Sequence, residues 1–273
     1  MDKVIIFGIY NFVSFHMGST LLNKGLEVIG LHIGEAPFLE EKRLEVGRNA
    51  NFKEISISQL DAYREDDTAK TTLIISLYDL YILDSENILQ KQTVTSLEQY
   101  IEKNKNLTDI IFILPIQLLI SNEAQALRTF IEHAIAWRKK NRFYYLPAIY
   151  GPWQPSVFTF QQALMAKRDD SVIRASKREW TGDILFVDDA VEAILASSEN
   201  SDAVDNMNFL IESGKENYWV QCAEQLKLDK VIIEGVQSEQ LEIDKTIKRV
   251  TVKRVTPFNN SIEEQIEIVK RLI

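Results

Sequence analysis

The chain is poor in cysteine: Cys222 is the only one among its 273 residues. A single cysteine cannot form a disulfide within the chain, and such sparse use fits a reducing compartment. Cys222 lies in a helical pattern with no histidine matched to it, so we expect no nucleophilic role for its thiol. These observations predict a cytoplasmic protein.

Positive charge is also scarce, because 31 lysines and arginines face 40 aspartates and glutamates, for a formal net charge of −9 at pH 7. A nucleic-acid backbone needs a basic face, so this balance argues against nucleic acid as a partner. The apolar-rich stretch 4–22 is interrupted by Asn11 and His16 and lacks the roughly 18 uninterrupted apolar residues of a membrane span. Its preceding residues, MDK, are not net positive, so we expect neither a signal peptide nor a membrane segment.

Glycine is rare as well, with ten in the whole chain. A nucleotide-binding fold usually places several glycines in its phosphate loop, where the backbone must approach the ligand closely. The scarcity is a first indication that such a loop has been altered. The three histidines, His16, His32 and His133, show no spacing that suggests a metal site.

The first thirty residues contain a strand, a helix and a second strand. The run "VIIFG" (4–8) is β-branched and predicts a buried strand. Apolar residues then recur at helical spacing over 12–24, and Gly25 is placed to end that helix. The run "EVIGLHI" (27–33) predicts the next strand, which completes a βαβ unit.

Strands and helices continue to alternate along the chain. Further strands are predicted at 52–58, 71–78, 109–115, 143–149, 230–236 and 248–255, and helices at 86–104, 121–140, 157–168, 189–198, 216–226 and 261–273. Such alternation is typical of an α/β, doubly wound and mostly parallel Rossmann-like sheet. We expect a dinucleotide-binding-type domain over 1–150 and a smaller C-terminal α/β cap over 151–273.

The loop after the first strand has an incomplete phosphate-loop pattern. The spacing G-x-x-G-x-x-G falls on Gly8, Asn11 and Ser14. Gly8 still permits the tight turn, and Asn11 tolerates the positive φ of the second position, but its side chain takes space that a pyrophosphate would need. This pattern is compatible with a weakened dinucleotide site and with an ordinary turn that binds no dinucleotide.

The second strand is followed by His32, where a ribose-binding acid is expected. A neutral imidazole can accept a ribose hydroxyl, although more weakly than a carboxylate, and a cationic one could face a 2′-phosphate. A third interpretation is that His32 lies in solvent at the end of the strand and binds no ligand.

Four segments together resemble the extended class of short-chain dehydrogenases/reductases, which contains NAD-dependent sugar-nucleotide epimerases and dehydratases. These segments are "FGIYNFVSFHMGSTLLNKGLEVIGLH" (7–32), "AIYGPWQP" (148–155), "DILFVDDAVEAILAS" (183–197) and "SIEEQIEIVKRLI" (261–273). The resemblance implies a Rossmann-like fold and NAD or NADP as the cofactor. Because the phosphate loop is altered, we expect this cofactor to bind weakly or not at all. Any cofactor contacts that it implies fall on Gly8, Tyr10, Asn11, Phe12, Val13, His32, Tyr78 and Arg128.

The catalytic positions of that family are not matched here. In that family a tyrosine exchanges a proton with the substrate, and a lysine lowers the pKa of the tyrosine and binds the nicotinamide ribose; these two positions align with Ala124 and Arg128. No hydroxyl follows the fifth predicted strand until Ser121. Further family positions align with Tyr145, Ala148, Gly182 and Asp183, and Tyr78 and Asp79 stand where the family has small residues beside the cofactor. We therefore name no catalytic residue.

Other conspicuous residues have structural interpretations. Asp189 with Glu192, and Ser261 with Glu264, each predict the start of a helix through a capping box. Trp153 and Trp180 are expected to be packed rather than to stack on a ligand, and the segment 150–152 is expected to turn the chain between its two parts.

Two functions remain from the sequence. The first is a non-catalytic binding or regulatory module with a nucleotide or small molecule in its cleft. The alternative is an NAD(P)-dependent sugar-nucleotide epimerase, dehydratase or reductase in which Tyr78, Tyr145 or Tyr150 supplies the proton and Arg128 holds a cofactor phosphate. In either case the helix over 121–140 could pair two copies as a homodimer.

Overall fold

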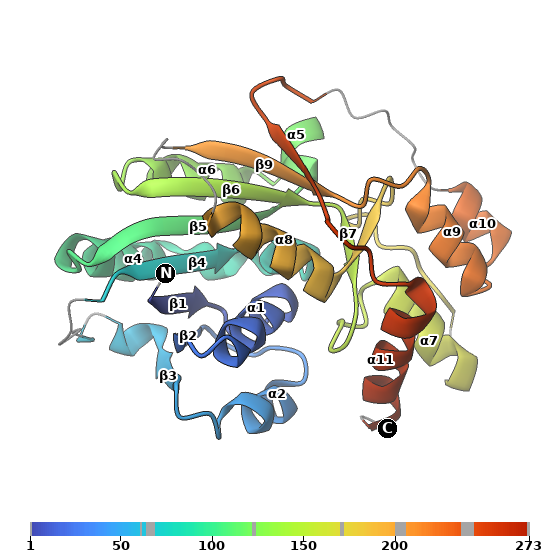
Figure 1. Cartoon of the computed structure of the whole chain (residues 1–273), viewed down its shortest axis with the longest axis horizontal. Helices are drawn as coiled ribbons and strands as arrows, with labels where there is room; N and C mark the ends of the chain where they lie inside the picture. The colour runs from blue at the N-terminus through green and yellow to red at the C-terminus, as the bar shows by residue number, and fades with distance from the viewer. Residues whose placement is uncertain are drawn as a thin grey trace.

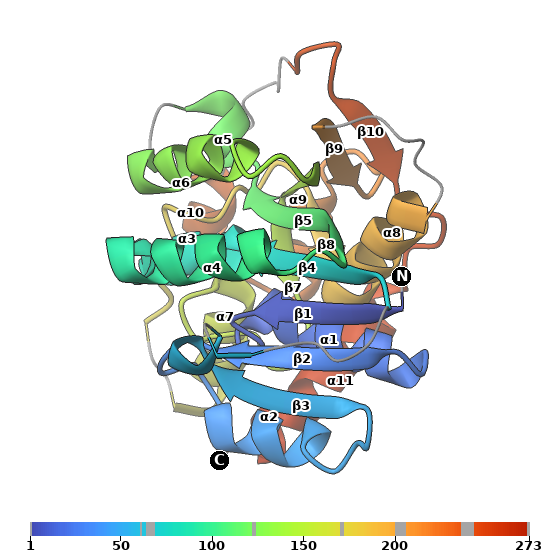
Figure 2. The ribbon, with the colours of Figure 1, turned by 90° about the vertical axis from the view of Figure 1, so that its left-hand side faces the viewer.

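A computed structural model describes residues 2–60, 62–63, 69–121, 124–169, 172–199, 206–235 and 243–271. Eight parallel strands form its central sheet in the order β10-β9-β6-β5-β4-β1-β2-β3. Figure 2 shows these strands stacked from β10 to β3. The predicted doubly wound, Rossmann-like α/β fold is therefore confirmed.

The strands are β1 (Lys3–Phe7), β2 (Glu27–His32), β3 (Phe52–Ser56), β4 (Thr71–Ser76), β5 (Leu107–Pro115), β6 (Lys140–Leu146), β7 (Ala148–Tyr150), β8 (Ile184–Phe186), β9 (Met207–Glu212) and β10 (Lys248–Thr251). The α-helices are α1 (Phe12–Asn23), α2 (Leu39–Val46), α3 (Leu77–Ile82), α4 (Lys91–Lys103), α5 (Gln117–Ile120), α6 (Gln125–Ile135), α7 (Thr159–Asp169), α8 (Val187–Glu199), α9 (Tyr218–Gln225), α10 (Lys230–Glu234) and α11 (Phe258–Arg271). Two short 3₁₀ helices are η1 (Ile57–Gln59) and η2 (Glu86–Leu89).

Helices cover both faces of the sheet, with α1 and α8 in front of it and α4 and α6 behind it in Figure 1. The central strands are covered on both faces, so their side chains are apolar in both directions, and all five residues of β1 are buried. The hydrophobic core is continuous through the sheet and its helices.

The part of the chain beyond residue 150 does two things. It returns to the central sheet with β9 and β10, and it forms a separate group around the two-stranded parallel sheet of β7 and β8. Figure 1 places α7, α9, α10 and α11 together beside this small sheet. The carboxyl ends of β4 and β5 therefore face these helices and the small sheet rather than open solvent.

The strand predicted over 230–236 is wrong within the described residues, because Lys230–Glu234 is a helix, α10. The side chain of Asp229 accepts a hydrogen bond of 2.9 Å from the Val231 amide and caps the first turn. This local cap outweighs the strand preference of the run VII. Position 236, like 122–123 and 272–273 of two predicted helices, lies outside the described residues.

Both predicted capping boxes are also wrong. Helix α11 begins at Phe258, so Ser261 lies inside it, fully buried, with its hydroxyl 2.6 Å from that of Tyr150. Helix α8 begins at Val187, and Asp189 instead accepts hydrogen bonds of 2.7 Å from the amide and the hydroxyl of Thr256. These contacts tie α11 to β7, and tie Thr256, just before α11, to α8.

The predicted helix over 121–140 is shorter than expected, and several other predicted ranges end early or are divided. Helix α6 covers Gln125–Ile135, the predicted helix 86–104 is η2 followed by α4, and the predicted strand 71–78 ends at Ser76. Strand β9 has no counterpart among the predicted elements. In the described part of the chain, no helix has the length and apolar character needed to cross a membrane.

Candidate functional site

The turn between β1 and α1 depends on Gly8, whose φ is +67°. The Gly8 amide donates to the Leu31 carbonyl, and the Asn11 amide donates to the Gly8 carbonyl over 2.8 Å. Asn11 has a φ of −69°, so the turn does not use the positive φ that asparagine would tolerate there. A Cβ on Gly8 would lie 2.7 Å from the Asn11 side-chain nitrogen, which shows that the asparagine side chain folds back onto the glycine.

The first turn of α1 is capped by Asp79 from α3. Its Oδ1 accepts a hydrogen bond of 3.0 Å from the Val13 amide, and its Oδ2 accepts one of 3.3 Å from the Ser14 amide. The hydroxyl of Ser76, the last residue of β4, donates to the same Oδ2 over 2.8 Å. A helix N-terminus presents free N–H groups that attract anions, and here the anion is a side chain of the protein itself.

A buried lysine lies behind this carboxylate. Lys42 of α2 is fully buried, and its Nζ donates to the Tyr10 carbonyl over 2.8 Å. Burial lowers the pKa of Lys42 to about 7, and the charge of Asp79 opposes this shift. The pKa of Asp79 is raised overall, because burial raises it by more than its hydrogen bonds from Val13, Ser76 and Ser14 and the charge of Lys42 lower it.

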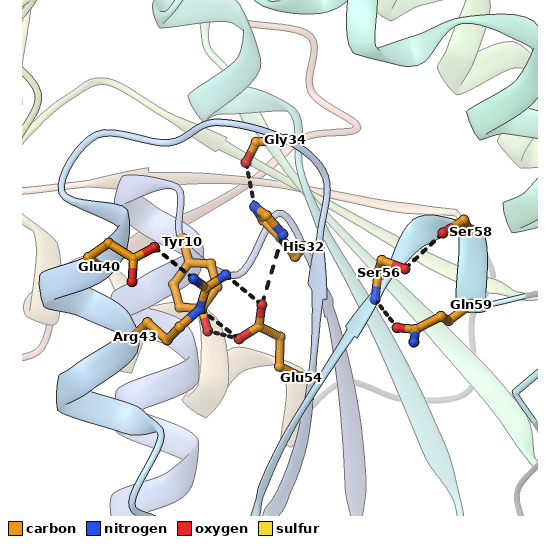
Figure 3. Close-up of polar contacts among 9 residues, drawn as sticks. All are labelled: Tyr10, His32, Gly34, Glu40, Arg43, Glu54, Ser56, Ser58 and Gln59. Atoms are coloured by element: carbon orange, nitrogen blue, oxygen red, sulfur yellow. Dashed lines mark hydrogen bonds and ion pairs between the residues drawn. The ribbon is translucent and has the colours of Figure 1, made fainter.

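A polar cluster fills the region beside the end of β2 (Figure 3). The Tyr10 hydroxyl donates to Glu54 Oε2 over 2.6 Å, and Arg43 donates to both oxygens of Glu54 over 3.0 and 2.8 Å. The Arg43 guanidinium also lies over the Tyr10 ring, 5.4 Å from its centroid. Burial raises the pKa of Tyr10, and the hydrogen bond to the Glu54 carboxylate raises it further.

His32 belongs to the same cluster. Its Nε2 lies 2.6 Å from the Gly34 carbonyl oxygen, its Nδ1 lies 3.9 Å from Glu54 Oε1, and its ring packs edge-on against Tyr10. The carbonyl can only accept, so Nε2 carries a proton. One ring nitrogen of His32 thus contacts the loop after β2, and the other points toward the Glu54 carboxylate, which Arg43 already binds.

The remaining predicted cofactor residues are buried in apolar packing. Phe12 and Val13 are fully buried, and Phe12 packs edge-on against Phe158. Tyr78 is stacked on Phe158, and its hydroxyl accepts a hydrogen bond of 3.2 Å from the Ile149 amide. The structure therefore brings seven of the predicted residues into one region: Gly8, Tyr10, Asn11, Phe12, Val13, His32 and Tyr78. There the Tyr10 hydroxyl binds Glu54, the Tyr78 hydroxyl accepts from the Ile149 amide, and His32 Nε2 lies against the Gly34 carbonyl.

Arg128 lies apart from that group, in the first turn of α6. Its guanidinium donates to the carbonyls of Leu118 and Ser121, the first over 2.8 Å. Ala124, the position aligned with the family's tyrosine, precedes the helix with a left-handed φ of +59°. The Arg128 side chain thus points back to α5 and to the residue that follows it.

The three tyrosines considered as substitute proton donors are all difficult to ionise. Burial raises the pKa of Tyr145 to about 12 and raises the pKa of Tyr78 and of Tyr150 strongly. Tyr150 is fully buried against Ser261, and Tyr145 lies 3.3 Å from Asn208 Oδ1. A catalytic phenol needs the opposite shift, toward neutral pH.

A cavity of about 840 Å³ opens beyond the carboxyl ends of β4 and β5. Its walls come from both parts of the chain, including Tyr81, Gln117, Glu179, Trp180 and Trp219. Ligands of open α/β sheets usually bind outside the carboxyl ends of the strands, so this is the candidate ligand site of the molecule.

Several residues of these sites were missed in the sequence, or given only a space-filling role. The sequence identifies Asp79 only as a larger residue where the family has a small one, and it gives no functional signal for Lys42, Arg43, Glu54 and Glu179. A signal exists for Asp79, since an acid directly after a buried strand lies at the edge where helix N-termini gather. The partners of Glu54 lie 11 and 44 residues away in sequence, and no local pattern connects them.

Other predictions for single residues have mixed outcomes. Trp153 is packed as expected, against Phe15 and Phe38, whereas Trp180 is half-buried and lines the cavity. The Asp183 carboxylate accepts hydrogen bonds from the Ser213 amide and hydroxyl. Within the residues that the structure describes, no cluster of three or more His, Cys, Asp and Glu side chains is suited to a metal ion.

Comparison with known proteins gives matches among solved structures alone. No family model matches the sequence, and no curated protein matches it. UDP-glucuronic acid 4-epimerase from Bacillus cereus in complex with NAD is 14% identical, with 99% of each chain covered and a TM-score of 0.71. The Bordetella bronchiseptica enzyme WbmH in complex with NAD⁺ is 13% identical, again with 99% of each chain covered, and has a TM-score of 0.67.

A third match is dTDP-glucose 4,6-dehydratase from Bacillus anthracis in complex with NAD, at 10% identity and a TM-score of 0.65, covering 99% of this chain and 97% of that one. All three cover nearly the whole length, although their sequences are very different from this one. The chain therefore has the α/β Rossmann-like fold on which NAD-dependent sugar-nucleotide epimerases and dehydratases are built.

Proposed function

We propose that this protein is a ligand-binding module that works without NAD(P) and without proton transfer by a tyrosine–lysine pair. The observation that carries the proposal is the Asp79 carboxylate on the amides of Val13 and Ser14. A dinucleotide pyrophosphate would need the first turn of α1 as its anion site. The residues present do not fit that group, because a second anion at the same amides would meet the buried carboxylate of Asp79.

The adenosine end of such a cofactor would meet the same difficulty. Glu54 accepts three hydrogen bonds from Arg43 and Tyr10, so most of the acceptor capacity of its carboxylate is already used. Tyr10 is fully buried, so its side chain fills space beside this cluster that a ligand would otherwise occupy. These contacts support the view that the protein's own side chains stabilise the ends of β1 and β2, which a bound dinucleotide stabilises in dinucleotide-binding proteins of this fold.

The alternative function, an NAD(P)-dependent sugar-nucleotide epimerase, dehydratase or reductase, is favoured by the fold of the matched structures and by the NAD in their complexes. It requires a phenol that ionises readily near the substrate. Burial moves the pKa values of Tyr78, Tyr145 and Tyr150 upward instead. The geometry of this chain therefore favours the non-catalytic proposal.

Titration of the purified protein with NADH and with NADPH separates the two functions. Calorimetry and cofactor fluorescence should show no binding in the micromolar range for either cofactor. Micromolar binding, together with turnover of any nucleotide sugar, would refute the proposal and establish the alternative.

A further inference from the structure

The strand at one edge of the central sheet carries a concentration of positive charge. Residues 245–254, which we term the basic edge, include β10 and contain no aspartate or glutamate. Their five cations are all exposed: Lys245, Lys248, Arg249, Lys253 and Arg254. The whole chain has a formal net charge of −9, so the basic edge is a local exception in an acidic protein.

Most of these cations have no partner within the protein. Arg249 lies 3.2 Å from Glu212 Oε2, in an ion pair at the surface that contributes little. The side chains of the other four form neither an ion pair nor a hydrogen bond with any described residue. Like charges this close in sequence along one strand and its flanks repel one another, so their combined field favours an anionic ligand.

The backbone of β10 has unused hydrogen-bonding groups on its outer side. Among the described strands β10 pairs with β9 alone, and Figure 2 shows it at one end of the stack. The Val252 amide donates to the Glu212 carbonyl over 3.0 Å, so Val250, two residues earlier, also directs its backbone groups toward β9. The N–H and C=O groups of Arg249 and Thr251 therefore point away from the sheet.

The charges of the basic edge determine which strand can be added there. A second copy of β10 would bring lysine and arginine side chains against the same side chains, and like charges across two strands are destabilising. Cations on an edge strand are a common protection against such self-association. They favour a strand of opposite charge, because its carboxylates would lie beside the unpaired ammonium groups.

An acidic peptide suits the basic edge better than a nucleic acid or an anionic membrane does. Both of those present a wide, highly charged surface, which the net charge of −9 repels at a distance. A short peptide contacts the basic edge alone. Its backbone can also pair with the outward N–H and C=O groups of Arg249 and Thr251, as in other cases of recognition by an added strand.

We propose that the basic edge binds an extended acidic segment of another protein, which adds to the central sheet beside β10. The backbone of that segment pairs with Arg249 and Thr251, and its carboxylates lie near Lys248 and Lys253. The inference goes beyond the proposed function and does not depend on it, because β9, β6, β5 and β4 separate β10 from β1 and the Asp79 site.

The test uses the full chain and a fluorescein-labelled peptide of four Thr-Glu repeats, whose anisotropy is measured at low and at physiological ionic strength. We expect the Thr-Glu peptide to bind and a Thr-Lys peptide of the same length not to bind. A Pro-Glu peptide has the same charge but lacks every second N–H, so it should bind more weakly. Hydrogen exchange at the Arg249 and Thr251 amides should slow when the Thr-Glu peptide is present.

The double variant Lys248→Glu/Lys253→Glu should weaken binding of the Thr-Glu peptide roughly 5- to 20-fold at low ionic strength. Lys91→Glu/Lys105→Glu is the matched control, because it reverses two exposed lysines outside the basic edge and changes the net charge equally. It should leave most of the affinity intact. Thr251→Pro removes one outward N–H without changing any charge, at a position where an edge strand tolerates proline, and it should also weaken binding.

Two further probes test the other anionic partners. Pentathymidylate has four phosphates and so matches the charge of the Thr-Glu peptide, and vesicles of phosphatidylcholine and phosphatidylserine test a membrane surface by cosedimentation. We expect pentathymidylate to bind more weakly than the peptide, and the protein to stay in solution when the vesicles are sedimented.

Five results would overturn the inference. The first three are no binding of the Thr-Glu peptide at millimolar concentration, equal losses of affinity in the two double variants, and equal binding of the Thr-Glu and Pro-Glu peptides with unchanged exchange at Arg249 and Thr251. The others are tighter binding of pentathymidylate than of the peptide, and cosedimentation with the vesicles. None of these measurements involves NADH or NADPH, so their failure is distinguishable from failure of the proposed function.

Discussion

The Asp79 carboxylate lies across the first turn of α1, with Oδ1 3.0 Å from the Val13 amide nitrogen. These residues are 66 positions apart, yet the contact joins the ends of β1 and β4, which are neighbours in the sheet. A fully buried carboxylate is costly without strong donors, and the two amides and the Ser76 hydroxyl supply them. The fold thus places its own carboxyl group on the helix N-terminus where a dinucleotide fold receives an anion.

Removing that carboxylate should expose the anion site. Asp79→Ala frees the Val13 and Ser14 amides and leaves the Lys42 ammonium nearby. We expect the free energy of unfolding to fall by about 1–3 kcal/mol, because buried donors lose their partner. We also expect inorganic pyrophosphate, which should not bind the wild type, to bind the variant and to restore part of its stability.

Asp183→Ala is the matched control, because Asp183 is a half-buried carboxylate that accepts hydrogen bonds from the Ser213 amide and hydroxyl and from the Ile184 amide. It should lose stability without gaining affinity for pyrophosphate. Calorimetry that found no pyrophosphate binding to Asp79→Ala, or equal binding to both variants, would contradict the role assigned to Asp79.

Lys42 should make stability depend on pH. Its pKa is about 7 in the folded protein, against roughly 10.4 for a lysine in an unfolded chain. Between these values the unfolded state binds more protons, so the free energy of unfolding should rise as pH increases from 7 toward 10, and should fall as pH decreases through 7. Urea unfolding of the wild type and of Lys42→Met over this range measures the effect.

The rise should be absent in Lys42→Met. Lys24→Met should retain it, because Lys24 is exposed and pairs with Glu192 at the surface. A wild-type profile parallel to that of Lys42→Met would mean that the ammonium is not buried as described.

Tyr10 should stabilise the protein through its hydroxyl as well as its ring. Tyr10→Phe keeps the packing but removes the 2.6 Å hydrogen bond to the Glu54 carboxylate. The expected loss is about 1.5–3 kcal/mol, the range for hydrogen bonds to charged groups. Tyr145→Phe, which removes a longer contact of 3.3 Å to Asn208, should cost less. Equal losses in thermal unfolding would show that the cluster around Glu54 contributes little.

The sequence predicts the central fold well, because buried parallel strands leave a strong local signal. The runs VIIFG and DIIFILP are apolar on both faces, and the residues between strands follow the 3.6-residue period. The run KVIIEGV shows the limit, since its β-branched residues suggest a strand while the Asp229 side chain caps a helix. A short segment of this kind is decided by one hydrogen bond rather than by periodicity.

The candidate site is less predictable, since its contacts are non-local. Gly8 marks the turn, and the missing tyrosine and lysine are visible at Ala124 and Arg128. The partners of Asp79, Tyr10 and Glu179 lie in other elements, and their pairing follows from the order of strands in the sheet. A single sequence gives the residues of such a cluster but not the contacts that determine its chemistry.

Asp189 should hold the last helix onto the body of the protein. Its carboxylate receives the Thr256 amide and hydroxyl just before α11 begins, so Asp189→Ala leaves the amide without its acceptor. We expect a loss of about 1–3 kcal/mol in the free energy of unfolding and faster hydrogen exchange in α11 than in β1 or β4. Glu192→Ala, one turn later on α8, removes an exposed ion pair with Lys24 and should change stability by less than about 1 kcal/mol. If exchange in α11 were unaltered in the Asp189 variant, the helix would have to be held by its apolar face alone, through Phe258, Ile262 and Val269.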